Sequence, residues 1–265
     1  HQLLSPKKII LATGASKNAL TFPGCTLPGV MSAGAVQTMV NLHRVLPAQN
    51  TLMIGSGNVG LIVSYQIIQA GGRVEALVEA APSIGGYGVH SAKVSRAGVP
   101  ILTGHTVLHA YGKNQVEGAV IVALDEKFRP VAGTEQDIKV GCISIAVGLT
   151  PLTELAAMCG CEFIYVPRLG GHLPLHDENM ETTAPGIYVA GDISGVEEAS
   201  SAMEEGRLAG IAAAESLGHV TPDTAKVLKA EVKRRLDALR TGRFGQARRD
   251  AKNMIVSEGR KCLVK

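Results

Sequence analysis

The sequence predicts an α/β protein that ends in a helical tail. Residues 51–79 read as an apolar strand, a glycine turn, an apolar helix and a second strand. Residues 187–217 read as another strand followed by a helix, and beyond residue 221 apolar residues recur every three or four positions among Lys and Arg. Strands that alternate with helices in this way are typical of a parallel sheet covered by helices.

The composition is that of a globular protein with one large core or two modest ones. The chain has 265 residues, of which 46% are apolar. We predict no membrane span and a cytoplasmic location, because no apolar run approaches the roughly 20 residues of a span and the first residues lack a signal-peptide pattern. The five cysteines include no CxxC pair, which favours a reducing compartment. Cys159 and Cys161 are too few ligands for zinc, and we predict no metal site.

The charge is distributed unevenly along the chain. Residues 1–220 carry 13 basic and 18 acidic side chains, whereas residues 221–265 carry 13 basic and 5 acidic ones. A basic tail can bind nucleic acid, but such sites also use aromatic residues for stacking, and Phe244 is the tail's one aromatic residue. We therefore predict no nucleic-acid partner. The tail is expected to pack on the same chain or on another subunit.

The glycine turn is the strongest candidate for a binding site. It reads Gly55-Ser56-Gly57-Asn58-Val59-Gly60. In such a turn Gly55 permits the sharp bend after the strand, Gly57 lets a pyrophosphate approach the backbone, and Gly60 lets the helix lie close to the sheet. The helix N-terminus then offers N–H groups and a positive dipole end to the phosphates. This pattern predicts a Rossmann-like site for a dinucleotide.

Glu79 indicates which dinucleotide is bound. It ends the second strand, 19 residues after Gly60, where a carboxylate can accept hydrogen bonds from the adenosine ribose. The carboxylate would repel a 2′-phosphate, and Arg73 stands at the other end of the strand. The sequence therefore favours NAD(H) over NADP(H). A plain strand–helix–strand turn without nucleotide is the alternative at this point.

The remaining elements follow from apolar periodicity and from turn residues. Helices are predicted at residues 33–46, between His90 and Gly98, at 197–217, and from Thr221 onward. Strand-like runs occupy residues 7–14, 100–102, 106–111, 116–124 and 139–147, and the third and fourth runs form a hairpin. The tail helix presents an apolar stripe at Val227, Leu228, Val232, Leu236 and Leu239. Residues 242–245 are expected to break this helix, and a second, short basic helix follows.

Several segments resemble the pyridine nucleotide-disulfide oxidoreductase superfamily of flavoproteins. Residues 7–14 end in Ala12-Thr13-Gly14, and residues 22–30 read FPGCTLPGV, both similar to the segment that crosses from the FAD domain into the NAD domain. Gly148 stands in a glycine-proline return like that of the family. Residues 181–192 end in Gly191-Asp192 and resemble the second FAD motif. The resemblance implies that Thr13, Gly14, Gly191, Asp192 and Ala199 contact FAD, with Asp192 accepting from a ribityl hydroxyl.

The resemblance also implies the domain organisation. It places a Rossmann-like NAD-binding domain at residues 26–141 inside an incomplete FAD-binding domain at residues 1–25 and 142–220, with a basic helical tail at residues 221–265. The family's other GxGxxG, which binds the ADP half of FAD, precedes the ATG motif and is not found in this sequence. We therefore expect a fragment of a longer polypeptide in preference to a natural short subunit.

The resemblance is closest to the flavoprotein subunits of sarcosine oxidase, opine oxidase, cyanide-forming oxidases and proline dehydrogenase complexes. It implies, for the full-length form, an FAD-dependent NAD(P)H oxidoreductase that passes hydride between NAD(H) and flavin and works with a partner dehydrogenase or electron-transfer subunit. The chain alone can be inactive. The alternative is a non-catalytic nucleotide-binding or assembly module whose tail grips a partner. We identify no catalytic side chain, and His172 and His176, separated by Pro174, do not share a helix face.

Overall fold

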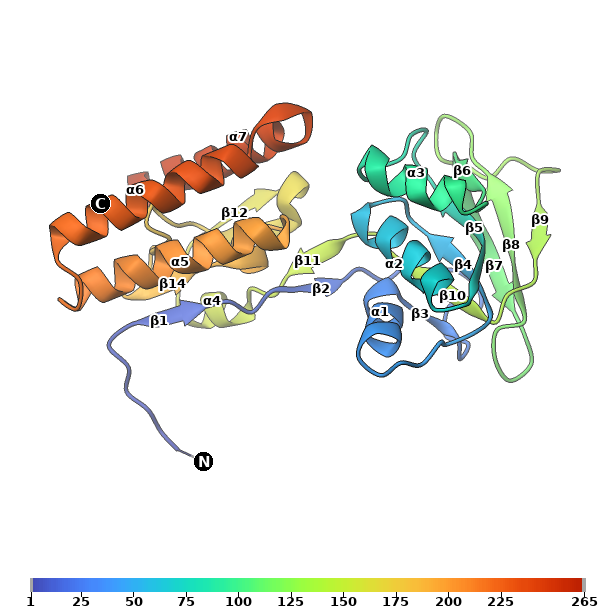
Figure 1. The fold of residues 1–265 in the computed structure, drawn as a ribbon, viewed down its shortest axis with the longest axis horizontal. Coiled ribbons are helices and arrows are strands. Elements are labelled where there is room, and N and C mark those ends of the chain that lie inside the picture. The colour runs from blue at the N-terminus through green and yellow to red at the C-terminus, as the bar shows by residue number, and fades with distance from the viewer. Residues whose placement is uncertain (1, 264–265) are drawn as a thin grey trace. The chain divides into compact units, whose positions relative to one another are not determined.

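The computed structural model describes residues 2–263, except for the side chains of Arg243, Phe244 and Leu263. The chain forms two compact units (Figure 1). Unit 1 comprises His1–Ser16 and Leu149–Lys265, and unit 2 comprises Lys17–Gly148. These limits differ from the sequence-based boundaries at residues 25 and 142. They differ because the segment after Lys17 packs into unit 2, where Phe22 is buried in the core.

Unit 2 is built on a five-stranded parallel sheet with the order β3-β10-β4-β5-β6. The strands are β3 (Val30–Ser32), β4 (Asn50–Ile54), β5 (Arg73–Glu79), β6 (Ile101–Thr103) and β10 (Cys142–Ile145), and the helices are α1 (Ala33–Asn41), α2 (Asn58–Gln69) and α3 (Gly88–Arg96). The helices cover one face, where Val36, Leu61 and Val94 pack with Met53 and Leu77 of the sheet. The predicted parallel α/β architecture is thus confirmed.

A small antiparallel sheet covers the other face of the parallel sheet (Figure 1). It consists of β7 (His105–Tyr111), β8 (Gly118–Ala123) and β9 (Gln136–Ile138). Leu52 and Ile54 of β4 pack here with Val107 and Ile121. Because both faces of the parallel sheet are buried, its strands are apolar on both sides. The predicted hairpin is present as the β7–β8 pair.

Unit 1 combines short strand pairs with three long helices. Strand β1 (Ile9–Leu11) runs parallel to β14 (Ile187–Val189), β2 (Ala15–Lys17) pairs with β11 (Leu149–Pro151), and β12 (Phe163–Val166) is antiparallel to β13 (Gly171–Pro174). The helices are α4 (Glu154–Met158), the 3₁₀ turns η1 (Pro167–Leu169) and η2 (Gly191–Ser194), α5 (Ala199–Ser216), α6 (Pro222–Leu239) and α7 (Gly242–Leu263). Among the described residues, no helix combines the length and hydropathy that a bilayer span requires.

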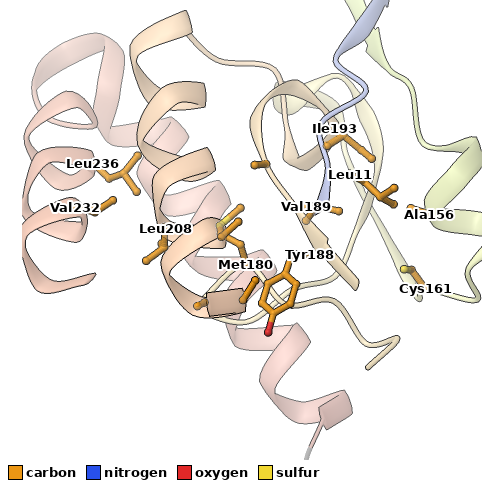
Figure 2. Close-up of a cluster of buried hydrophobic side chains, with 14 residues drawn as sticks. Leu11, Ala156, Cys161, Met180, Tyr188, Val189, Ile193, Leu208, Val232 and Leu236 are labelled. Atoms are coloured by element: carbon orange, nitrogen blue, oxygen red, sulfur yellow. The ribbon is translucent and has the colours of Figure 1, made fainter. Parts of the chain in front are cut away.

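The tail helix α6 packs on α5 of the same chain. Figure 2 shows Val232 and Leu236 of α6 reaching toward Leu208 of α5, and these residues share one core with Tyr188 and Met180. Of the predicted apolar stripe, Val232 and Leu236 are therefore the residues that are buried in this core. Of its other members, Val227 is 68% exposed, and Leu228 and Leu239 also reach the surface.

Two predicted helix limits are wrong. The first helix ends at Asn41 instead of residue 46, because Arg44 adopts a left-handed conformation (φ 57°) that a right-handed helix cannot continue through. The second tail helix is not short, since α7 has 22 residues. The predicted break at residues 242–245 is also wrong, because the chain leaves the helical conformation only at residues 240 and 241, and α7 already begins at Gly242 (φ 72°).

Candidate functional site

The glycine turn lies between the carboxyl end of β4 and the N-terminus of α2. Gly55 has φ 100°, and a Cβ there would lie 2.3 Å from the Ala146 carbonyl oxygen. A Cβ on Gly60 would lie 2.0 Å from the Gly55 carbonyl oxygen. Both positions therefore require glycine for the turn to form, as the sequence pattern indicated.

Gly57 differs from the other two glycines of the turn. Its φ of −63° and ψ of 171° are open to any residue, and apart from Gly57 and its two chain neighbours no described atom lies within 4 Å of where its Cβ would stand. Neither strain nor crowding explains a glycine here. Gly57 is the N-cap of α2, whose dipole favours an anion at this end. The open space above Gly57 fits a phosphate group that approaches the backbone.

Glu79 closes the same turn from the neighbouring strand. Its Oε2 accepts hydrogen bonds from the backbone N–H of Ser56 (2.9 Å) and from Ser56 Oγ (2.6 Å), and its Oε1 accepts from the N–H of Ala81 (2.9 Å). A carboxylate offers about four acceptor positions, so one remains for a ligand hydroxyl. The sequence predicts a ribose partner for Glu79, but it did not reveal that Glu79 also holds Ser56.

The segment after Glu79 folds back onto the turn. The N–H of Gly85 donates to Ser56 Oγ (3.0 Å), and the N–H of Tyr87 donates to Asn58 Oδ1 (2.8 Å). The structure thus gives Ser56 and Asn58 a positioning role that the sequence pattern did not show. Val59, which follows Asn58 in the turn, is partly buried against the face of the parallel sheet that the helices cover.

The Thr13–Gly14 turn of unit 1 is tied to the strand that re-enters this unit. Thr13 Oγ1 donates to the Leu152 carbonyl oxygen (2.6 Å), and the Leu152 N–H donates to the Gly14 carbonyl oxygen (2.9 Å). Gly14 has φ 73° and open space at its Cβ position. Gly148, at the end of unit 2, has φ 119°, and its carbonyl oxygen accepts from Asn18 N–H (3.1 Å).

Gly191 and Asp192 form the turn η2 directly after β14. Gly191 has φ 77°, which favours glycine, and Asp192 is partly exposed. Ala199 is the exposed first residue of α5. The structure therefore brings Gly191 and Asp192 together at the carboxyl end of a buried strand, and it places Ala199 at a helix N-terminus.

A buried charge cluster of Glu205, Arg240 and Lys252 is hydrogen-bonded to this turn. Glu205 of α5 is 2% exposed, and its Oε2 accepts from Gly191 N–H (3.0 Å) and Ser194 Oγ (2.8 Å). Its Oε1 accepts from Lys252 Nζ of α7 (2.8 Å) and from Arg240. Burial alone would raise the pKa of Glu205, but Lys252 and Arg240 outweigh it and lower the pKa to about 2. The tail thus reaches the Gly191 turn through an ionised carboxylate.

The pairing of the tail with Glu205 was missed in the sequence. Lys252 follows Glu205 by 47 residues, and a helical pattern does not show which acid a distant lysine will meet. The available signal was the opposite charge of the body and the tail. It indicated attraction without indicating the partners.

Comparison with known proteins gives a consistent result. A family model described as pyridine nucleotide-disulphide oxidoreductase matches residues 2–206. An opine oxidase subunit from Agrobacterium tumefaciens (strain Ach5) is 30% identical over 233 residues, covering 84% of this chain and 46% of that protein. Hydrogen cyanide synthase subunit HcnB of Pseudomonas aeruginosa is 27% identical over 263 residues, covering 91% and 55%. The chain spans about half the length of the curated relatives it matches.

Solved structures show the same fold. Thioredoxin reductase from T. acidophilum superposes with a TM-score of 0.64 at 21% identity, covering 80% of this chain and 66% of that one. An FAD-dependent pyridine nucleotide-disulphide oxidoreductase from Desulfovibrio vulgaris gives a TM-score of 0.61 at 23% identity, covering 80% and 55%. The predicted Rossmann-like fold class is confirmed.

Proposed function

Because the chain belongs to the pyridine nucleotide-disulphide oxidoreductase family, we propose that it is part of an FAD-dependent oxidoreductase that passes hydride between NAD(H) and flavin. The family match supports FAD and NAD(P) as the cofactors. The observation that carries the nucleotide part is the open space at Gly57, where α2 begins. When bound, the two cofactors supply the hydride transfer, and the chain supplies binding and orientation.

The nucleotide is held, in this proposal, by the turn after β4. The α2 N-terminus binds the pyrophosphate over Gly57, and the remaining acceptor position of Glu79 binds a ribose hydroxyl. Ser56 and Asn58 hold the surrounding backbone in place. The negative charge of Glu79 disfavours a 2′-phosphate, so NAD(H) is preferred over NADP(H).

The flavin is held by residues of unit 1. Asp192 accepts from a ribityl hydroxyl, and the N-terminus of α5 at Ala199 faces the flavin with its N–H groups. The Thr13–Gly14 turn lies against the cofactor, where the open Cβ position of Gly14 leaves room for it. Gly148 lets the chain turn as it leaves the nucleotide-binding domain.

The whole protein is proposed to work with a second polypeptide. The relatives that support this are themselves parts of larger enzymes: HcnB belongs to hydrogen cyanide synthase, and two others are subunits of opine oxidase and of sarcosine oxidase. We propose that the partner is a dehydrogenase or electron-transfer subunit, with electrons passing to or from it through the flavin.

The variant Gly57→Ala tests the nucleotide site. Its methyl group fits the structure without strain, so the midpoint temperature of thermal unfolding is expected to stay the same or rise slightly. The same methyl group would occupy the space of the pyrophosphate, and the Kd for NADH, measured by fluorescence titration, is expected to rise about 10-fold or more.

Gly206→Ala is the matched control, because its Cβ is equally unobstructed but belongs to α5 of unit 1 and not to the glycine turn. It is expected to leave the Kd for NADH unchanged. Failure of the unmodified chain to bind NADH, or equal binding by Gly57→Ala, would refute the proposed site.

A further inference from the structure

The loop at residues 190–198 connects β14 to α5 and contains the turn η2. The proposed function assigns flavin contacts to Asp192 in this loop and to Ala199 directly after it. The family model ends at residue 206, so it includes this loop but not the tail helices α6 and α7. Three basic side chains of the tail nevertheless reach the loop: Arg240, Arg248 and Lys252.

Lys252 of α7 makes the most direct contact with the loop. Its Nζ donates to the Ser194 carbonyl oxygen (2.9 Å), to Ser194 Oγ (2.9 Å) and to Glu205 Oε1 (2.8 Å). An ammonium group has three N–H donors, so each donor of Lys252 has one acceptor. Because Lys252 is also 3% exposed, these contacts are shielded from exchange with water.

Glu205 extends this contact to Gly191, the residue before Asp192. One carboxylate oxygen accepts from the Gly191 N–H (3.0 Å), and the other accepts from Lys252 and Arg240. A buried carboxylate is costly without cations, so the two tail residues keep Glu205 ionised. The hydrogen bond that fixes Gly191 is therefore charge-assisted, and its strength depends on the tail.

Two further ion pairs tie the other end of the loop to the tail. Arg240 Nε donates to both carboxylate oxygens of the buried Glu197 (3.1 Å each). Arg248 lies 3.5 Å from the carboxylate of Glu198, which is the N-cap of α5. The tail thus contacts the loop on both sides of Asp192 and directly before Ala199.

We propose that Lys252 is a positioning residue of the flavin site, acting through Ser194 and Glu205 on the turn that carries Asp192. This inference rests on the proposed flavin contacts of unit 1. A loop that is already fixed loses less conformational entropy when a cofactor binds to it, so binding is tighter. The tail is therefore part of the cofactor site, although its own side chains are not assigned a cofactor contact.

A matched control separates this role from the general stability of the tail. Lys229 of α6 also joins the tail to α5, through Glu215 (2.6 Å), and is also partly buried. Glu215 lies near the C-terminal end of α5, whereas the loop lies at its N-terminal end. Lys229→Met therefore removes a tail contact without touching the loop.

Hydrogen exchange of the cofactor-free chain, measured by mass spectrometry, tests whether Lys252 holds the loop. Amide hydrogens of residues 190–198 are expected to exchange about 10-fold faster in Lys252→Met and at the unmodified rate in Lys229→Met. Lys252→Arg keeps the charge, and the cavity of about 490 Å³ beside Lys252 and Arg240 has room for the larger group. It is expected to restore slow exchange.

His176 reports whether unit 1 stays folded in these variants. It is 2% exposed, and burial, together with the charge of Lys252, lowers its pKa to about 4. In a folded Lys252→Met the ring remains buried, so its pKa, measured by NMR, is expected to stay below the ordinary 6.5. If Lys252→Met does not fold, Lys252→Gln, which keeps an amide donor, takes its place in both experiments.

Titration calorimetry with FAD tests the consequence for the cofactor. The Kd is expected to rise about 10-fold or more in Lys252→Met and to stay within about twofold in Lys229→Met and Lys252→Arg. Unchanged exchange in the loop, or equal FAD affinity in Lys252→Met and Lys229→Met, would overturn the positioning role. Absence of FAD binding by the unmodified chain would instead refute the flavin site on which the inference rests, and the exchange rates show separately whether Lys252 holds the loop.

Discussion

Glu79 combines an internal and an external role in one carboxylate. Three of its acceptor positions hold Ser56 and Ala81, which fixes the turn before any ligand arrives. In the proposed nucleotide site, the carboxylate that would repel a 2′-phosphate is therefore also the group that holds Ser56 of the glycine turn in place.

The variant Glu79→Gln is expected to weaken NADH binding about 10-fold and to reduce the preference over NADPH. The amide keeps the size of the side chain but loses the charge and one pair of acceptor positions. Fluorescence titration with both nucleotides measures the change. Glu75→Gln is the control on the same strand, where Glu75 pairs with the exposed Arg73. An unchanged NADH-to-NADPH preference in Glu79→Gln would show that the carboxylate does not meet the ribose.

His176 is expected to make the stability of unit 1 fall in mild acid. The pKa of His176 is about 4 in the folded chain, against an ordinary value of 6.5. Between pH 6.5 and pH 4, the imidazole is therefore protonated in the unfolded chain but neutral in the folded chain. Stability is therefore full above pH 6.5 and is lost between pH 6.5 and pH 4, by up to roughly 3 kcal/mol. Urea unfolding at a series of pH values measures this loss.

The variant His176→Gln should remove this part of the pH dependence, although the amide itself changes stability at every pH. Part of the acid loss that remains comes from Glu205, whose lowered pKa contributes stability that is lost only below about pH 4.5. If the free energy of unfolding of His176→Gln falls as steeply between pH 6.5 and pH 4 as that of the unmodified chain, the effect comes from another group.

At the scale of elements, the charge of the tail is explained by its own chain. Helices α6 and α7 place basic residues against acidic residues of unit 1: Lys229 with Glu215, Arg235 with Glu204, Arg240 with Glu197, Arg248 with Glu198 and Arg260 with Glu178. Several of these pairs are exposed and contribute little individually. Together they show that acidic side chains of the same unit face several of the tail's basic side chains.

A further basic residue of the tail, Lys252 of α7, is buried and is expected to matter more than these pairs. Lys252→Met would leave the Glu205 carboxylate buried with Arg240 as its remaining cation, and unfolding in urea should show a loss of about 3 kcal/mol. Lys261→Met is the control on the same helix, since Lys261 is exposed and pairs with a surface acid. A loss no larger than the control's would mean that the cluster does not support α7.

At the scale of the whole molecule, local patterns predicted the fold well. The alternation of strand and helix and the glycine turn identified the parallel sheet, and the β7–β8 hairpin was read from its turn residues. The limits of α1 and α7 were less predictable. Arg44 turns left-handed without being Gly or Asn, and Gly242 stands at the start of α7 although glycine usually follows a helix end.

The sites were predictable where one short segment carries them. Gly55, Gly57 and Gly60 follow from local geometry. The structure shows that Gly55 and Gly60 are required by close backbone contacts, whereas Gly57 leaves open space. Contacts between distant segments were not predictable, because the partner of a side chain such as Glu205 or His176 depends on packing. That is why the charge cluster and the cavity became visible only in three dimensions.

Unit 1 is assembled from two segments on either side of unit 2, which sets an order of events during synthesis. Unit 2 is continuous and can fold as soon as it leaves the ribosome, whereas β1 waits for β14. Glu205 then waits longer, because Lys252 is translated 47 residues after it. Until α7 emerges, the turn at Gly191 rests on a carboxylate lacking one of its two cations. Helix α7, which is translated after α5, therefore completes a turn whose residues were made well before it.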